Sequence, residues 1–192
     1  MREFRNFVTP HSHVASLDTA SSPEAFLEKE VKLGTNYFSI SDHGTLAATR
    51  RVHKLAKSKG LIPCLGIEGY FRDDSCPILT TANYPKNERG AFTTSSKYSH
   101  LTIGLPSLAS YNKAIPLLSA ADARLEETLA MVEPKDRKHG SERKPLFRWA
   151  DLEELAAAGA VFGSGCLLGM GTRFLLMDQA DSKEMAIRYY QR

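Results

Sequence analysis

Short apolar runs alternate with amphipathic stretches along the first 71 residues of the chain. Apolar, aromatic and β-branched residues dominate at 6–8, 36–41 and 61–71, and each run predicts a β-strand. The stretches between them, 21–34 and 45–58, predict helices. Strand and helix therefore alternate, which predicts parallel strands joined by right-handed crossovers and hence an α/β fold.

The first of these helices has clear ends in "SSPEAFLEKEVKLG". Ser22 is a suitable N-cap, Pro23 suits the first helical position, and Gly34 suits the position just past the C-terminus. Leu27 and Val31 are four residues apart and share one face of the helix. These signals predict a helix that begins at Pro23 and ends before Gly34.

The pattern is less regular in the middle of the chain. Residues 72–99 are rich in turn-forming residues and predict a long excursion beside the functional site. "HLTIGL" at 100–105 predicts a short strand, and the helix predicted by "SLASYNKAI" is expected to end near Pro116. Residues 120–145 are charged and poorly periodic, which predicts a flexible, partly ordered insertion.

The last part of the chain returns to a regular pattern. "WADLEELAAAG" at 149–159 predicts a helix closed by Gly159, and "AVFGSGC" at 160–166 predicts a strand that ends in a glycine-rich turn. A chain of 192 residues can bury one substantial core, so we expect a single domain or most of one.

Composition and charge exclude several classes of protein. Hydrophobic residues make up 42% of the chain and charged residues 24%, as in ordinary globular proteins. No signal peptide and no run of about 18 apolar residues is present, so we expect a cytoplasmic protein without membrane contact. The three cysteines are odd in number and lack CxxC spacing, which argues against a disulfide scaffold and a structural zinc knuckle.

The net charge of +3 does not by itself imply nucleic-acid binding. Part of the basic excess lies in "PKDRKHGSERKPLFR" at 134–148. This segment can be a solvated loop or a patch that contacts phosphates, and the sequence leaves both interpretations open.

Imidazole, carboxylate and thiol groups fall at the predicted ends of strands, where functional groups collect in parallel α/β folds. They are His11 and His13 after the first strand, Asp42 and His43 after the second, Glu68 near the end of the third, and Cys166 after the last. His100 differs because it opens its predicted strand instead of closing it.

These are the side chains that zinc and related divalent ions prefer. Two histidines at i and i+2 on an extended chain point the same way, so His11 and His13 can bind one ion together. Several histidines and carboxylates at one rim can hold two or three ions. Such a cluster suits phosphoester hydrolysis, because the ions activate water and stabilise charge on the attacking and leaving oxygens.

Each residue also has a simpler interpretation. An isolated His-x-His pair can act as an acid–base pair or lie in a surface loop, and Asp42 can cap the helix that follows it. Cys166 can be a small buried apolar residue. Glu68 within an apolar strand is harder to explain without a partner, because a buried carboxylate needs one. Four of the six histidines fall at strand ends, which favours a metal site.

The remaining two histidines are not assigned to that site. His53 lies in the middle of a predicted helix and His139 lies in the charged loop, so we interpret both as structural or surface residues.

Taken in order, five segments resemble the PHP domain at the N-terminus of bacterial DNA polymerase III alpha subunits. They are "PHSHVASLD", "SISDHGTL", "LGIEGYF", "SHLTIGL" and "GSGCLLGM". "FLEKEVKLG", "KLAKSKGLIPCLGIEGYF" and "LFRWADLEELAAAG" are similar as well, so the resemblance runs over nearly the whole chain. The compact spacing is more similar to a phage-encoded polymerase than to a cellular one.

This resemblance implies a distorted seven-stranded (β/α) barrel, with a trinuclear metal centre at one mouth. The ligands that it implies are His11, His13, Asp18, His43, Glu68, His100 and Cys166. Glu68 would be a bridging and catalytic carboxylate, and Asp42 would orient His43 from behind. The ions would be zinc, manganese or iron, with magnesium in the polymerase part.

Two features depart from the family pattern. The loop between the His-x-His pair and Asp18 is shorter here than is usual in the family. The last family motif, an Asp-x-His pair, is absent before the chain ends at "RYYQR". We therefore expect residues 1–192 to be a PHP domain whose barrel is incomplete at its C-terminal end, and a fragment of a longer polymerase.

The resemblance implies metal-dependent phosphoester hydrolysis of the 3′→5′ exonuclease type, with DNA-directed DNA polymerase activity in the missing remainder. DNA is the implied partner, and the full-length protein would also contact a sliding clamp and a separate exonuclease. One alternative is a stand-alone PHP phosphoesterase similar to a histidinol-phosphate phosphatase. The other is a catalytically inactive domain that serves as a structural support and docking surface.

Overall fold

The computed structural model describes residues 11–14, 19–71, 99–124 and 145–165, together with Glu184 and Ile187. The elements in chain order are α1 (Pro23–Leu33), β1 (Tyr37–His43), α2 (Thr49–Ser58), β2 (Ile62–Phe71), β3 (Ser99–Gly104), α3 (Leu108–Ala123), β4 (Leu146–Phe147), α5 (Trp149–Ala157) and β5 (Val161–Gly163). Among these residues, no helix combines the length and the apolar character that crossing a membrane requires.

Strand β2 is the centre of a mixed five-stranded sheet with the order β1-β2-β3-β5. β1 pairs with it in parallel, from Tyr37 opposite Ile62 to His43 opposite Glu68. β3 pairs with its other edge in antiparallel orientation, and β5 is antiparallel to β3. β4 joins the last two residues of β2, beyond the point where β1 ends.

The parallel pairing of β1 and β2 across α2 confirms the predicted crossover, whereas the antiparallel β3 means that the sheet is mixed. In the part of the chain that the structure describes, the sheet is open and does not close into a barrel. The predicted first strand at 6–8 lies outside the described residues.

The end signals of α1 act as predicted. The Ser22 hydroxyl accepts a hydrogen bond from the Ala25 N–H at 3.2 Å, and Pro23 is the first helical residue. Gly34 adopts a φ of 70°, a left-handed conformation that costs a glycine little. Local sequence thus fixes both ends of the helix.

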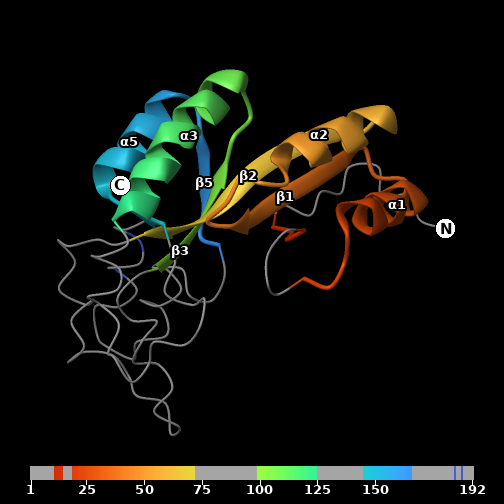
Figure 1. Ribbon diagram of the computed structural model, residues 1–192, viewed down its shortest axis with the longest axis horizontal. Helices are drawn as coiled ribbons and strands as arrows, with labels where there is room; N and C mark the ends of the chain where they lie inside the picture. The colour runs from red at the N-terminus through yellow and green to blue at the C-terminus, as the bar shows by residue number, and fades with distance from the viewer. Residues whose placement is uncertain are drawn as a thin grey trace, which may run out of the picture.

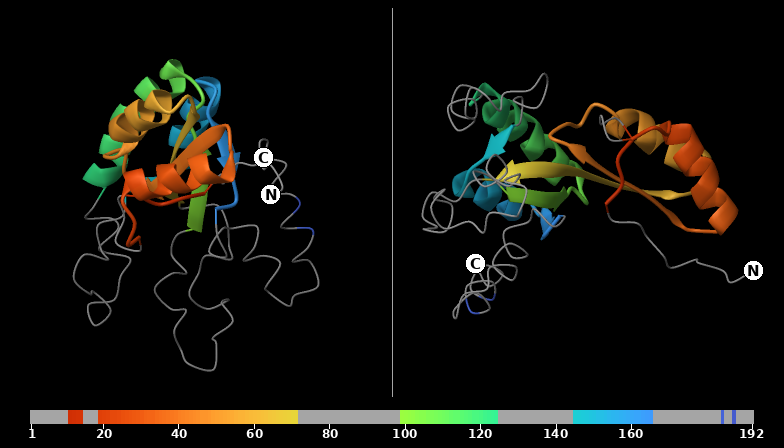
Figure 2. Two further views of the ribbon diagram at one scale, coloured as in Figure 1. Left: turned by 90° about the vertical axis from the view of Figure 1, so that its right-hand side faces the viewer. Right: turned by 90° about the horizontal axis from the view of Figure 1, so that it is seen from below.

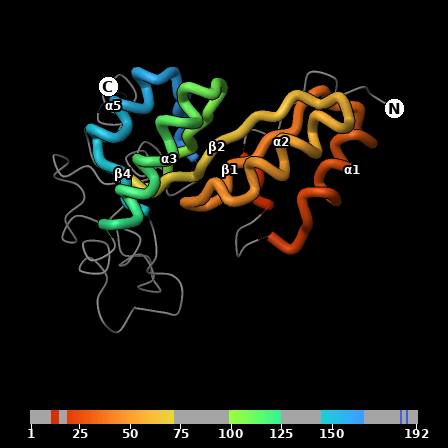
Figure 3. Tube along the Cα trace, turned by 45° about the horizontal axis from the view of Figure 1, so that its top comes forward, coloured from red at the N-terminus to blue at the C-terminus, as the bar shows by residue number. Residues whose placement is uncertain are grey.

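The helices form two groups. α2 packs on β1 and β2 with α1 beside it, while α3 and α5 pack on each other farther along the sheet (Figures 1 and 2). Each group covers its own cluster of buried residues. The cluster under α2 includes Phe38, Ile40 and Val52, and the cluster under α3 and α5 includes Ile67 and Phe71. β2 runs from one group to the other (Figure 3).

Helix α3 does not end at Pro116, as the sequence predicted, but continues to Ala123. A proline inside a helix costs about 3 kcal/mol because one hydrogen bond is lost and its ring crowds the preceding turn. Ala114 and Ala121, which flank Pro116, are fully buried in the core, so packing on both sides of the proline keeps the helix continuous. Residues 120–123 of the predicted insertion therefore belong to α3, and 125–144 lie outside the described residues.

A partly buried ion pair connects the start of α5 to the end of α3. The Arg124 guanidinium donates to both carboxylate oxygens of Asp151, at 2.6 and 3.1 Å, and to the Leu146 carbonyl at 2.7 Å. Asp151 also accepts the Arg148 N–H at 2.8 Å and so caps α5. These contacts join α3, β4 and α5 into one unit.

Candidate metal centre

Strand pairing brings three of the predicted ligands to one end of the sheet. His43 and Glu68 are direct partners on neighbouring parallel strands, so their side chains share one face. His100 lies opposite Tyr70, two residues from the position opposite Glu68, which makes it a diagonal neighbour of Glu68. Because β3 is antiparallel to β2, the first residues of β3 meet the last residues of β2. This explains why His100 opens its strand and still belongs with residues that close theirs.

Two hydrogen bonds hold the His-x-His segment beside β1. The Ser41 N–H donates to the Ser12 carbonyl at 2.8 Å, and the Val14 N–H donates to the Asp42 carboxylate at 2.6 Å. Ser12 is the residue between the two histidines, so the segment is fixed at its middle and at its end. His11 and His13 can then point to the same side, as their spacing predicts.

The Glu68 carboxylate is the point on which all four histidines converge. Oε2 lies 2.8 Å from His11 Nε2, 3.3 Å from His13 Nε2 and 3.1 Å from His43 Nδ1. Oε1 lies 2.5 Å from His100 Nδ1. Glu68 itself is only 1% exposed, whereas the histidines are between 8% and 25% exposed. One buried carboxylate thus forms the base of a rim of imidazoles.

The imidazoles also face one another. His11 Nε2 and His13 Nε2 are 2.9 Å apart, and the rings of His13 and His43 stack with centroids 4.3 Å apart. His11 Nε2 also faces Glu68 Oε2 at 2.8 Å, and a nitrogen that donates its one hydrogen to Glu68 has no lone pair left to accept from His13. This set of donors therefore fits a cation better than it fits hydrogen bonding alone.

Burial by itself raises the pKa of the Glu68 carboxyl. Hydrogen bonds from His100 and His11, together with the charges of His43 and His100, outweigh burial and hold the pKa well below its usual range. Glu68 is therefore an ionised carboxylate at neutral pH, as a metal ligand must be.

The donor atoms form two groups that can each hold an ion. His11, His13 and Glu68 make one group, and His43, Glu68 and His100 make the other. In each group the donor atoms lie within 4.8 Å of one another. Glu68 belongs to both groups and has one oxygen toward each of His11 and His100, so it can bridge two ions.

Asp42 makes a contact that the sequence did not suggest. Its carboxylate accepts the Val14 N–H at 2.6 Å, so it supports the end of the His-x-His segment. It does not cap α2, because the residue before that helix is Ala48 and no side chain there makes a capping bond. The buried Asp42, 1% exposed, is therefore a positioning residue for His11 and His13.

The remaining predicted ligands, Asp18 and Cys166, lie outside the described residues, as does His139. Gly165, the last described residue before Cys166, lies against the backbone of His100, so residues 163–165 approach the site. His53 is exposed on α2, as predicted for a surface residue.

Sequence reasoning missed Tyr70 and the reason for Gly44. The Tyr70 ring packs against His100 and His43, with centroid distances of 5.0 and 6.0 Å. Its place two residues after Glu68 on β2 is the signal that could have identified it. Gly44 has a φ of 57°, its N–H donates to the Glu68 carbonyl at 2.9 Å, and an added Cβ would lie 2.8 Å from Pro145. The glycine of "DHG" therefore lets the chain turn away directly after His43.

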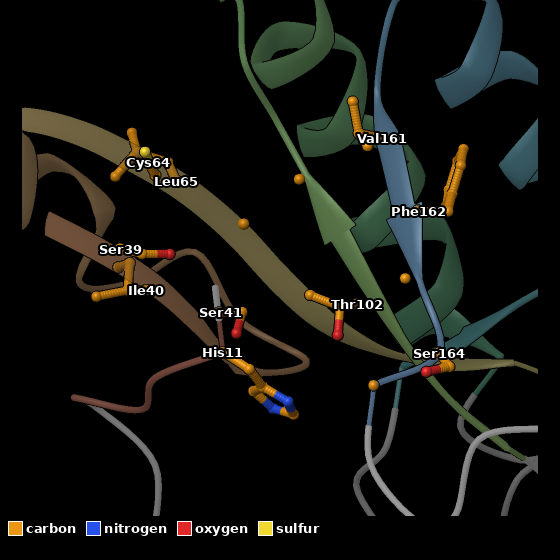
Figure 4. A pocket seen from close by; sticks show the side chains of 14 residues that line it. His11, Ser39, Ile40, Ser41, Cys64, Leu65, Thr102, Val161, Phe162 and Ser164 are labelled. Carbon is orange, nitrogen blue, oxygen red and sulfur yellow. The ribbon is translucent and has the colours of Figure 1, made fainter. Parts of the chain in front are cut away.

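A cavity of about 480 Å³ extends from His11 along the face of the sheet that carries Glu68. Figure 4 shows His11 at one end of it, Ser39 and Ser41 on β1, Thr102 on β3, and Val161 and Phe162 on β5. Small residues such as Gly66 and Gly104 also line it. The candidate metal centre thus lies at one end of a cavity over the face of the sheet that carries small residues.

Comparison with known proteins identifies the relatives of this chain. The PHP domain family matches residues 10–192. DNA polymerase III subunit alpha from Aquifex aeolicus is 24% identical over 189 residues, which are 97% of this chain and 14% of that protein. The same subunit from Mycobacterium tuberculosis is 25% identical over 195 residues, covering 96% of this chain and 15% of that protein. The chain thus spans about one seventh of the length of these relatives.

Among solved structures, the chain is similar to a candidate metal-dependent phosphoesterase from Bifidobacterium adolescentis. The TM-score is 0.48 and the identity is 15%, over 92% of this chain and 72% of that one.

Proposed function

Because the chain belongs to the PHP domain family, we propose that it is a metal-dependent phosphoesterase domain of the kind found in DNA polymerase III alpha subunits. The observation that carries the proposal is the buried Glu68 carboxylate shared by two groups of histidines. The reaction that suits it is hydrolysis of a phosphodiester at a DNA 3′ end, as in a 3′→5′ exonuclease.

The similarity to the polymerase subunits supports the polymerase part of the proposal. Two of them match along 96–97% of this chain, at 24–25% identity. Nucleotide addition would belong to the remainder of such a protein, and phage origin is part of the same proposal. So are the expected contacts of the full-length protein with DNA, a sliding clamp and a separate exonuclease.

The residues of this chain would hold divalent ions (zinc, manganese or iron) in two groups, His11 and His13 with Glu68 and His43 and His100 with Glu68. Such ions supply Lewis acidity that activates water and stabilises charge on phosphate oxygens. With neutral imidazoles, the described ligands carry only the single negative charge of Glu68. Two divalent ions would leave a net positive charge at the rim, which attracts a phosphodiester.

The seven-stranded barrel implied by the family resemblance is also part of the proposal. Its support is the small-residue face of the sheet, where Ser41 is 1% exposed and borders an open cavity. A face of this kind suits the interior of a barrel completed by further strands.

Two variants of the chain test the proposal through metal binding and hydrolysis together. In Glu68→Gln, the bridging carboxylate is replaced by a neutral amide that cannot bridge ions. Affinity for Zn²⁺ or Mn²⁺, followed by titration calorimetry, should fall by about 100-fold or more, since even supporting residues are worth 10–100-fold. Release of nucleotides from the 3′ end of a 5′-labelled single strand should fall with it. Glu154→Gln, at an exposed glutamate on α5, is the matched control and should change neither quantity.

The alternatives give different results in the same assay. A chain that binds no metal and releases no nucleotides would retain only the structural, docking role. Hydrolysis of histidinol phosphate without any hydrolysis of DNA ends would favour the stand-alone phosphoesterase. In the full-length protein, His43→Ala should abolish hydrolysis and leave nucleotide addition largely intact, and loss of both activities would contradict separate sites.

A further inference from the structure

A second cavity, of about 620 Å³, lies between α2 and the amino end of α3 over the first residues of β2. None of the candidate metal ligands in the described part of the chain lines it. We call it the α2–α3 groove. Its lining residues are Thr49, Arg50, His53, Lys54, Lys57, Ile62, Pro63, Leu65, Leu105, Pro106, Ser107, Leu108 and Tyr111.

The wall formed by α2 is basic. Arg50, His53, Lys54 and Lys57 follow one another at helical spacing, and all four are exposed. The segment from 45 to 60 contains five Lys and Arg residues and no Asp or Glu. This wall therefore carries several positive charges and no acidic residue of its own.

Arg51 differs from the basic residues of the groove because it forms an ion pair. Arg51 points toward α1 and pairs with Glu24 at 2.7 Å. Within the described residues, the three permanent cations of the groove, Arg50, Lys54 and Lys57, form no ion pair. Among the residues whose placement is described, the positive charge next to α1 is thus paired, and the positive charges that line the groove are not.

The opposite wall and the floor are apolar. Leu108 is 73% exposed and Ile62 is 50% exposed, so two large aliphatic side chains of this surface face solvent. Pro63, Leu105 and Pro106 continue this surface between them. The amino end of the 16-residue helix α3, with Ser107 as its N-cap, adds the positive end of a helix dipole to the same wall.

We propose that the α2–α3 groove binds an acidic, amphipathic segment of a partner protein, with its acidic residues toward α2 and its apolar residues toward Leu108 and Ile62. A helix with one acidic and one apolar face satisfies both walls at once. Duplex DNA fits less well, because its phosphates would face Leu108, Ile62 and Pro106 as well as the basic side chains of α2. The groove is separate from the metal centre, so this binding does not depend on the phosphoesterase proposal.

The test uses the full 192-residue chain, EDTA to remove metal, and a fluorescein-labelled peptide of about 16 residues with glutamates on one helical face and leucines on the other. Fluorescence anisotropy should show saturable binding. The double variant Lys54→Glu/Lys57→Glu should weaken binding by about tenfold or more, because it reverses the charge of the wall. Leu108→Ser should weaken it by about fivefold, through loss of apolar contact alone.

The matched control is Lys29→Glu/Lys32→Glu, which makes the same change of charge on exposed positions of α1. It should bind the peptide like the unchanged chain. Equal weakening by this pair would show a nonspecific effect of net charge and overturn the proposal. No binding of the peptide would overturn it too. The proposal would also be overturned if a single-stranded oligonucleotide displaced the peptide and its own binding were unaffected by Leu108→Ser. The groove would then be a nucleic-acid site.

Discussion

The two faces of the sheet carry opposite kinds of residue on the same strands. The helix-covered face presents Phe38, Ile40, Ile67, Phe71, Leu101 and Ile103, all buried. The other face presents Ser39, Ser41, Gly66, Glu68, Thr102 and Gly104, and it ends at the histidines. Alternation along each strand separates packing from chemistry, so each face can be changed without directly altering the other.

The largest effect is expected on the covered face. Phe71 is fully buried, and its ring contacts Trp149 edge to face at 4.8 Å between centroids. Phe71→Ala should lower the free energy of unfolding by about 3–5 kcal/mol, through lost burial and the cavity that remains. Urea denaturation measures this value. Thr102→Ala on the other face should cost less than about 1 kcal/mol, and similar losses for the two would contradict the contrast between the faces.

The next largest effect is expected on metal affinity, at Asp42, which supports the His-x-His segment. Asp42→Ala should weaken binding of Co²⁺ by about tenfold, because the Val14 N–H loses its acceptor and the His-x-His segment loosens. The visible absorption of bound Co²⁺ should broaden, which a general loss of stability would not cause. Asp42→Asn keeps an oxygen that can accept this hydrogen bond and should recover most of the affinity. No recovery would mean that the charge of Asp42 matters, and not its hydrogen bond.

A third effect concerns pH in the metal-free protein. The pKa of Glu68 is lowered by folding, so the unfolded chain takes up this proton first as the pH falls. The stability that Glu68 contributes is complete above the unfolded pKa, about 4.3, and is lost as the pH falls toward the lower folded value. Between about pH 4.5 and 2.5, the free energy of unfolding of the unchanged chain should fall more steeply than that of Glu68→Gln, by up to about 1.4 kcal/mol per pH unit. Urea denaturation at each pH measures both curves. Parallel curves for the two proteins would show that Glu68 is not the group responsible.

The smallest effect, of opposite sign, is expected at Ser41. Within the described residues its buried hydroxyl has no hydrogen-bond partner, so Ser41→Ala should leave stability unchanged or raise it by up to about 1 kcal/mol. Ser110 is equally buried, but its hydroxyl donates to the Ser107 carbonyl at 2.9 Å and takes part in the cap of α3. Ser110→Ala should cost about 1 kcal/mol by thermal unfolding. A clear loss of stability in Ser41→Ala would reveal a partner for this hydroxyl.

Features set by neighbouring residues could be predicted from the sequence. Ser22, Pro23 and Gly34 define α1 because capping is a contact between residues three or four apart. The crossover from β1 to β2 followed from the length of the helix between two apolar runs. The grouping of His43 with Glu68 followed in turn, because parallel strands end at the same edge.

Features that depend on distant pairing could not be predicted in this way. Alternation along "HLTIGL" predicts a strand but not its direction, and the direction is what brings His100 to Glu68. The partner of Asp42 is a backbone N–H 28 residues earlier in the chain, which no local signal indicates. The continuation of α3 through Pro116 likewise depends on tertiary packing of Ala114 and Ala121.

Strand β2 connects the two groups of helices, and this arrangement has a consequence for how the protein opens. His11, His13 and His43 belong to the half that contains α1 and α2, whereas His100 belongs to the half that contains α3 and α5. Glu68 on β2 contacts histidines from both halves. An opening that separates the two halves must part His100 from Glu68. We therefore expect the two hydrophobic clusters to lose hydrogen-exchange protection together when that contact breaks.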